Sequence, residues 1–297
     1  MSSTTSPETA NRPVAVIGAG TLGRRIAAVF ASGGSQVRVI DFSDEQRNAA
    51  VEYINENAPK LKERLDGAAD IEILPVETFE DSDAESLADV WLVIEAVPER
   101  LDIKRPLFVT LDKLAPSDAI LATNSSSYRS SQVIDEVKGT ERVLNMHFAM
   151  PPASMAVEIM SDGETDQAYI DRLVNDLPAF GLLPFVAMEQ STGFIFNRIW
   201  AAIKRESLNV VAEGVSTPKD VDDIMKANAG MPQGPFWHMD QVGLDVVLDI
   251  ENHYAKENPH LPEGPRKLLQ KYVDAGDLGQ KTGRGFFDYS KDSAESK

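Results

Sequence analysis

The chain contains no cysteine among its 297 residues. This absence excludes disulfides and thiolate catalysis, and it is consistent with a reducing compartment. Positive charge is also scarce, because 29 lysines and arginines stand against 47 aspartates and glutamates, for a formal net charge of −18. Nucleic acids and anionic membranes are therefore disfavoured as partners, since both are themselves polyanions.

Long hydrophobic runs are missing as well. No apolar run approaches the length of a membrane span, and the segment Met1–Asn11 lacks the basic and apolar parts of a secretory signal. We therefore expect a cytoplasmic protein without a membrane-embedded part. Hydrophobic residues make up 42% of the chain and charged residues 26%, which is ordinary for a globular protein. The length suits two domains.

The most informative pattern is an apolar, β-branched run, Val14–Ile17, that leads into a Gly-x-Gly-x-x-Gly turn. In such a turn Gly18 permits the tight bend, Gly20 lets the backbone approach a pyrophosphate, and Gly23 lets the next helix pack closely. The helix N-terminus offers free N–H groups and the positive end of its dipole to the phosphates. The predicted dinucleotide-binding residues are Gly18, Gly20, Thr21, Leu22 and Gly23.

A second apolar run, Val37–Ile40, ends at Asp41, 18 residues after Gly23. A carboxylate at this point is placed to meet a ribose 2′-hydroxyl and to repel a 2′-phosphate. Because Phe42 and Ser43 supply no cation, the sequence predicts NAD rather than NADP as the cofactor.

Apolar and helical patterns alternate as far as residue 188 and then change to helices alone. The alternation predicts an α/β fold, a Rossmann-type doubly wound parallel sheet, followed by an all-α C-terminal domain. The expected domains are 12–190 for NAD and 191–297 for substrate and dimerisation. The expected strands are 13–17, 36–41, 71–74, 90–96, 119–123, 143–147, 157–159 and 183–188, with a late one at 285–289. The expected helices are 21–32, 43–65, one through Pro106 to Leu114, 165–180, 192–213, 217–227, 235–257 and 264–275.

Polar residues follow two of the expected buried strands. Asn124-Ser125-Ser126-Ser127 comes after one strand, and His147 ends the next. Ligands of open α/β sheets bind outside the carboxyl ends of the strands, so these side chains are candidates to face the nicotinamide. The alternative for residues 124–127 is a serine-rich turn that caps a helix. The alternative for His147 is a purely structural role.

Glu158 lies eleven residues after His147, inside the apolar run 155–160. A carboxylate in such a run needs a partner, and His147 is the economical one. Glu158 would fix the tautomer of His147 and stabilise the imidazolium that forms when His147 takes a hydroxyl proton. The pair predicts general-base catalysis in a dehydrogenase of alcohols.

Taken together, the motifs of this chain resemble the L-3-hydroxyacyl-CoA dehydrogenase family over about residues 13–289. The resemblance rests on the following segments in the expected order: 16–23, Glu95-Ala96-Val97-Pro98-Glu99, 123–127, His147-Phe148, Val157-Glu158, 192–198, Gly234-Pro235-Phe236, 240–245 and Lys281-Thr282-Gly283-Arg284-Gly285-Phe286. The resemblance implies that His147 is the catalytic histidine and Glu158 its acidic partner. It also implies that Ser126 hydrogen-bonds the substrate and Asn197 lies beside the substrate carbonyl. Glu99, Lys104 and Asn124 are then close to the nicotinamide and its ribose, no metal is involved, and the helical domain forms a homodimer.

The sequence leaves open whether the substrate carries a CoA group. Where the family often has an asparagine, this chain has Met150, and Trp237-His238 follows Gly-Pro-Phe. His238 is a candidate pocket residue or an ordinary helix residue. Acidic residues outnumber the basic residues of region 44–70, which disfavours binding of the CoA phosphates there. The family resemblance, in contrast, favours a 3-hydroxyacyl-CoA of fatty acid metabolism as the substrate. The alternatives are a small hydroxy acid or sugar acid without CoA, a reductive amination, and a non-catalytic NAD-binding protein on the same fold.

Overall fold

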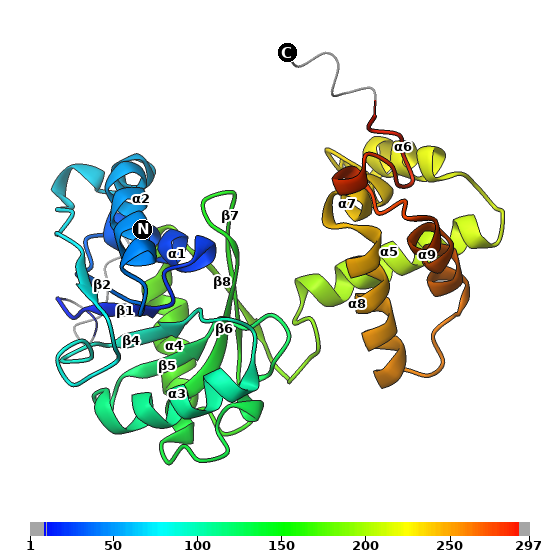
Figure 1. Cartoon of the computed structure of the whole chain (residues 1–297). Helices are drawn as coiled ribbons and strands as arrows, with labels where there is room; N and C mark the ends of the chain where they lie inside the picture. Colours follow the sequence, from blue (N-terminus) through cyan, green and yellow to red (C-terminus); the bar gives the residue numbers. More distant parts are fainter. Residues whose placement is uncertain (1–8, 10, 291–297) are drawn as a thin grey trace. The chain divides into compact units, whose positions relative to one another are not determined.

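A computed structural model describes Thr9 and residues 11–290 of the chain (Figure 1). The expectation about the N-terminal segment Met1–Asn11 falls almost wholly outside these residues. The chain forms two compact units, Met1–Ile195 and Phe196–Lys297. Across the described residues, no helix combines the length and the apolar character that crossing a membrane needs.

The first unit is built on one eight-stranded sheet with the order β3-β2-β1-β4-β5-β6-β7-β8. Neighbouring strands run parallel except β6 and β7, which are antiparallel, so the expected doubly wound α/β sheet is confirmed as a mostly parallel one. The strands are β1 (Val14–Ile17), β2 (Val37–Ile40), β3 (Glu77–Phe79), β4 (Leu92–Glu95), β5 (Ile120–Thr123), β6 (Val143–Met150), β7 (Ser154–Met160) and β8 (Leu183–Ala187).

Helices cover both faces of this sheet because its strands are apolar on both sides. In β1, Val14 and Val16 join the core under one set of helices, while Ala15 and Ile17 join the core on the opposite face. Figure 1 shows α1 and α2 against one face and α3 against the other. The helices of this unit are α1 (Thr21–Ser32), α2 (Asp44–Lys62), α3 (Leu101–Leu114) and α4 (Gln167–Asp176).

Two expected strands differ from the structure. The apolar run 71–74 forms no strand, and the edge strand β3 instead begins at Glu77, beyond Pro75. Proline has no N–H to give to a ladder, so pairing starts after it. The segment 285–289 forms no strand, and its Asp288 makes only an isolated bridge with Arg284.

The second unit is helical in its described part and has its own core. Leu208, Phe236, Met239, Val247 and Leu269 are buried together there. Its helices are α5 (Phe196–Ala212), α6 (Pro218–Ala229), α7 (Pro235–Val242), α8 (Leu244–Glu257) and α9 (Gly264–Ala275). The single helix expected over 235–257 is interrupted at Gly243, whose φ of 104° is incompatible with a helix.

A buried carboxylate organises the end of the second unit. Asp240 is fully buried and accepts hydrogen bonds from the backbone N–H groups of Phe286 and Phe287, each at 3.0 Å, and from the Tyr289 hydroxyl at 3.0 Å. Burial raises the pKa of Asp240. A Cβ on Gly285 would lie 2.2 Å from Asp240 Oδ1, so this glycine is what lets the segment close around the carboxylate.

Candidate functional site

The turn between β1 and α1 is shaped for a close approach to a ligand. Gly18 has a φ of 97°, and a Cβ there would lie 2.6 Å from the carbonyl oxygen of Ala96. A Cβ on Gly23 would lie 1.8 Å from the carbonyl oxygen of Gly18, so α1 can start this close to β1 only with glycine. A Cβ on Gly20, in contrast, would meet no atom within 4 Å, because Gly20 borders open space.

The N-terminus of α1 is left uncapped by the protein. Its N-cap residue Gly20 has no side chain to cap it, and the first turn contains no acid. The first N–H groups of a helix have no partners inside the helix. At α1 they remain for an anion, and the helix dipole favours one.

A cavity of about 1050 Å³ lies beside this turn, at the carboxyl ends of β1, β2 and β4. Small-molecule pockets usually measure roughly 300–1,000 Å³, so the space suits a ligand of dinucleotide size. The cavity-lining residues include Gly18, Gly20, Thr21, Asp41, Phe42, Ala96 and Val97. The open Gly20, the free helix N-terminus and this cavity together fit a bound NAD.

Asp41 is fixed on both carboxylate oxygens. Oδ2 accepts from the backbone N–H of Ala19 at 2.8 Å, and Oδ1 accepts from the N–H of Ser43 at 2.9 Å. Arg47 also reaches this place, because it donates to the backbone carbonyl of Asp41 and pairs with Asp44. The sequence interpretation overlooked Arg47 because it considered only the two residues directly after Asp41. The first turn of α2 brings residue 47 back to the end of β2.

A buried ionic network connects β4, β5 and α3 beside the cavity. Glu95 is fully buried, and its Oε1 accepts from Lys104 Nζ at 2.6 Å and from Val97 N–H at 2.8 Å. Its other oxygen, Oε2, accepts from the Thr123 hydroxyl at 2.7 Å. Burial raises the pKa of Glu95, and the charge of Lys104 acts in the opposite direction. Lys104 lies also 3.2 Å from Glu99 Oε2, so one buried ammonium serves two carboxylates.

Glu99 orders the loop that follows β5. It accepts hydrogen bonds from the Ser125 hydroxyl and from the backbone N–H of Ser127. Burial would raise the pKa of Glu99, but the bond from Ser125 and the charge of Lys104 outweigh it and hold the pKa below its ordinary value. Ser125 is buried in this network, whereas Ser126 and Ser127 are exposed. Ser125 is therefore the serine that forms the turn, as the alternative to a ligand contact expected.

Asn124 connects this loop to the next strand. Its Oδ1 accepts from the backbone N–H of Phe148 at 2.9 Å, one residue after His147. Asn124 thus fixes the end of β6 relative to β5. Asn124 follows the carboxyl end of β5, and Glu99 and Lys104 follow the carboxyl end of β4, which is the neighbouring strand.

His147 and Glu158 face each other across the antiparallel pair β6 and β7. Their Cα atoms are register partners, and His147 Nδ1 lies 3.1 Å from Glu158 Oε2. Glu158 Oε1 accepts from the backbone N–H of Ile195 at 2.8 Å. A hydrogen bond from Nδ1–H to this carboxylate leaves the lone pair on Nε2, so the pair is arranged to accept a proton there.

Phe194 and Ile195 complete the surroundings of this pair, and sequence reasoning missed both. The Phe194 ring stacks on the His147 ring, with centroids 4.9 Å apart and planes 20° apart. The expected helix over 192–213 concealed this arrangement, because residues 192–195 form a turn with positive φ at Gly193 and Phe194 and α5 begins only at Phe196. Gly193 was the signal in the sequence that the helix had not yet started.

Two candidates lie in the second unit. Asn197 is the second residue of α5 and is partly exposed. His238 in α7 lies in an aromatic cluster, with its ring centroid 5.5 Å from that of Trp200 and 5.0 Å from that of Trp237. Burial lowers the pKa of His238, while Asp222 acts in the opposite direction. His238 is therefore held among aromatic rings rather than standing alone on a helix surface.

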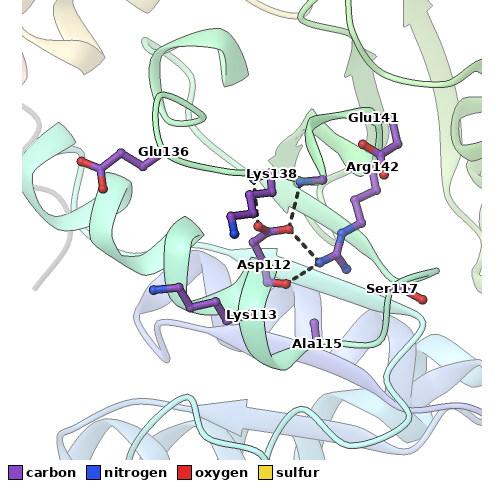
Figure 2. A pocket seen from close by; sticks show the side chains of 9 residues that line it. Asp112, Lys113, Ala115, Ser117, Glu136, Lys138, Glu141 and Arg142 are labelled. Carbon is purple, nitrogen blue, oxygen red and sulfur yellow. Dashed lines mark hydrogen bonds and ion pairs between the residues drawn. The ribbon is translucent and has the colours of Figure 1, made fainter.

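Another cavity, of about 420 Å³, lies at the opposite edge of the sheet, where β5 and β6 begin (Figure 2). Figure 2 shows Asp112 between Arg142 and the backbone of Lys138. Arg142 also donates to the carbonyl oxygens of Pro116, at 2.5 Å, and Ala119, at 3.3 Å. These contacts occupy the guanidinium of Arg142. The residues of this cavity therefore connect segments of the fold rather than offer a free cation to a ligand. In the part of the chain that the structure describes, no cluster of His, Asp or Glu could hold a metal ion.

The comparisons with known proteins cover nearly the whole chain. Residues 13–190 match the family described as "3-hydroxyacyl-CoA dehydrogenase, NAD binding domain", and residues 193–289 match "3-hydroxyacyl-CoA dehydrogenase, C-terminal domain". The 3-hydroxybutyryl-CoA dehydrogenase of Clostridioides difficile is 35% identical over 281 residues, which are 94% of this chain and 99% of that protein.

Two solved structures are similar as well. The 3-hydroxybutyryl-CoA dehydrogenase of Escherichia coli K12 has a TM-score of 0.83 at 31% identity, covering 94% of this chain and 60% of that one. A diketoreductase, described as catalysing reactions of dicarbonyl compounds, has a TM-score of 0.77 at 29% identity, covering 94% of this chain and 99% of that one.

Proposed function

This chain belongs to the 3-hydroxyacyl-CoA dehydrogenase family, and we propose that it interconverts a 3-hydroxyacyl-CoA and the corresponding 3-ketoacyl-CoA. It is an NAD-dependent oxidoreductase that acts on a CH–OH group. The observation that carries the proposal is the contact between His147 and Glu158 at the end of the strand that Asn124 ties to the cofactor side of the sheet.

His147 is the proposed general base. NAD, when bound, supplies the acceptor for the hydride of the carbinol carbon. Nε2 of His147 takes the hydroxyl proton, and the carboxylate of Glu158 stabilises the imidazolium that results. The bond from Ile195 N–H keeps Glu158 oriented toward His147. In the reverse direction the imidazolium returns the proton to the keto oxygen.

Other residues have positioning roles in this proposal. Phe194 covers one face of the imidazole and limits the access of water to it. Ser126 and Asn197 hydrogen-bond the substrate, as in the family that the sequence resembles. Glu99, Lys104 and Asn124 shape the cofactor side of the site.

A small 3-keto compound without CoA is the second candidate. Three cations of region 44–70 are already engaged: Arg47 with Asp44, Lys60 with Glu56 at 2.9 Å, and Lys62 with the carbonyl of Ile71 at 2.5 Å. Region 44–70 thus has few cations left for the phosphates of CoA. The similarity to a diketoreductase points in the same direction.

The two candidates are separated by substrate turnover measured through NADH absorbance. Acetoacetyl-CoA is compared with a small free 3-keto acid and its ester at two salt concentrations. Our proposal expects the CoA ester to have the highest kcat/KM, with a preference that falls as salt rises. Equal or better turnover of the free acid or ester favours the second candidate. No turnover of any 3-keto compound overturns both.

Assembly and cellular context are further parts of the proposal. We infer an NAD domain over 12–190 and a substrate and dimerisation domain over 191–297, with a homodimer formed by the second. Exposed apolar side chains of the helical unit, such as Ile199, Val242 and Val246, support the dimer. The absence of cysteine supports a reducing compartment such as the cytoplasm, and a 3-hydroxyacyl-CoA substrate would place the reaction in fatty acid metabolism.

A further inference from the structure

Two adjacent arginines in α1, Arg24 and Arg25, have no carboxylate partner among the described residues. The Nε atoms of both are buried without a hydrogen-bond partner. Arg25 Nη1 donates to the carbonyl oxygen of Pro151 at 2.9 Å, a neutral acceptor. In a chain whose acids outnumber its bases by 47 to 29, two neighbouring cations without an acid call for a physical reason.

An aromatic ring holds both guanidinium groups in place. The guanidinium carbons of Arg24 and Arg25 each lie 5.5 Å from the ring centroid of Tyr53 on α2, so they are at most twice that distance apart. A ring orients a cation without neutralising its charge. Glu56, one turn after Tyr53, pairs with Lys60 instead. Among the residues that the structure describes, no acid therefore neutralises the positive charge of the two arginines, which remains for a bound group.

Arg25 contacts the residue that directly follows β6, the strand of His147, and both arginines lie outside the lining of the dinucleotide cavity. Pro151, the acceptor of Arg25, comes four residues after His147, which at about 3.3 Å per residue is at most about 13 Å along the strand. Neither arginine lines the cavity at Gly18 and Gly20. The N-terminus of α1 would hold the pyrophosphate of NAD there.

We propose that Arg24 and Arg25, oriented by Tyr53, form a subsite for the phosphate groups of the CoA handle of the substrate. This inference rests on the proposed function. Guanidinium groups bind phosphate oxygens through paired, charge-assisted hydrogen bonds. The carboxylate of a free 3-hydroxy acid lies only two carbons from the reacting centre, too close to His147 to reach these arginines. The phosphates of CoA lie a pantetheine chain away, and the subsite replaces the engaged cations of region 44–70.

The experiment compares two thioesters of one acyl group. Acetoacetyl-CoA carries the phosphates, and S-acetoacetyl-N-acetylcysteamine lacks them. In the variant Arg24→Gln/Arg25→Gln we expect kcat/KM for acetoacetyl-CoA to fall by about 10- to 100-fold, mainly through KM, with a weaker dependence on salt. Turnover of the cysteamine thioester and the Kd of NADH stay within about twofold of the unsubstituted protein. Arg24→Lys/Arg25→Lys recovers part of the loss, since it keeps both charges.

The matched control is Lys113→Gln/Lys138→Gln, which removes the same charge from exposed positions at the opposite edge of the sheet (Figure 2). We expect this variant to keep the KM for acetoacetyl-CoA. An equal loss on both thioesters would assign the arginines to the support of Pro151, and a weakened NADH Kd would assign them to the cofactor. Either result, or no change at all, overturns the subsite. Turnover of the cysteamine thioester by the unsubstituted protein leaves the proposed function standing in each of these cases, and its absence counts against that function separately.

Discussion

The carboxylate of Asp41 accepts a hydrogen bond from the backbone amide of Ala19 over 2.8 Å. This contact ties the end of β2 to the glycine turn and places a negative charge at the edge of the dinucleotide cavity. Arg47 lies close by, but Asp44 and the carbonyl of Asp41 hold it. We therefore expect the carboxylate of Asp41 to be the group at this edge that determines the cofactor choice.

Asp41→Ala should raise the ratio of kcat/KM for NADP to that for NAD by about tenfold or more, equivalent to about 1.4 kcal/mol of removed repulsion. The measurement is steady-state turnover with both cofactors. Asp44→Ala is the matched control, because it releases Arg47 and keeps the carboxylate of Asp41, so the preference for NAD should persist. Equal use of NADP by the unsubstituted protein would contradict the prediction.

His147→Gln should lower kcat by about 10²–10⁴-fold, which is the usual size of general-base catalysis. Glu158→Gln should also lower kcat, because the imidazolium loses its counter-charge. NADH binding, followed by fluorescence, should stay unchanged in both variants, since neither residue lines the dinucleotide cavity. Near-normal turnover of either protein would remove His147 and Glu158 from the proposed chemistry.

Glu95→Gln should destabilise the protein by about 3–5 kcal/mol, because it leaves the fully buried Lys104 without its closest partner. The double variant Glu95→Gln/Lys104→Met removes both charges and should recover much of this loss. Urea unfolding at pH 7 measures all three proteins. If the double variant is no more stable than Glu95→Gln, the two charges do not depend on each other.

Glu99→Gln offers a test of pH dependence. The pKa of Glu99 is below its ordinary value in the folded protein, so ionisation of Glu99 stabilises the fold at a pH above the ordinary value of 4.5. That contribution is lost as the pH falls through the lowered pKa. The difference in Tm between the unsubstituted protein and Glu99→Gln, measured without NAD, should therefore shrink between pH 6 and pH 3. A difference that grows on acidification would show the opposite shift.

The homodimer is open to a direct measurement. Light scattering at micromolar concentration should give twice the mass of one chain. Ile199→Lys and Val246→Lys place a charge on exposed apolar positions of the helical unit and should shift the protein toward a monomer. As a control, Leu183→Lys changes an exposed apolar residue of β8 in the first unit and should leave the dimer intact. A monomer in the unsubstituted protein would refute the assembly.

Local patterns were sufficient to predict the glycine turn and seven of the eight strands of the sheet, all except β3. The apolar strands and the three glycines depend on neighbours a few residues away, and the doubly wound sheet formed as expected. His147 and Glu158 came together because one hairpin connects their strands, so eleven residues of sequence separation were enough.

The sequence patterns did not predict the contacts between segments that are distant in the chain. Phe194 reaches His147 through a turn with positive φ that an apolar run concealed, and Gly243 interrupts what reads as one continuous helix. The roles of Arg24 and Arg25 depend on Tyr53, which lies in another helix. Composition counts charges, but it does not say which of them have partners.

The three hydrogen bonds that reach Asp240 also bear on how the protein is made. Their donors, Phe286, Phe287 and Tyr289, follow the carboxylate by 46 to 49 residues in the chain. During synthesis Asp240 therefore leaves the ribosome before any of these donors. The environment that buries its carboxylate is complete only once the last described turn of the chain has been made.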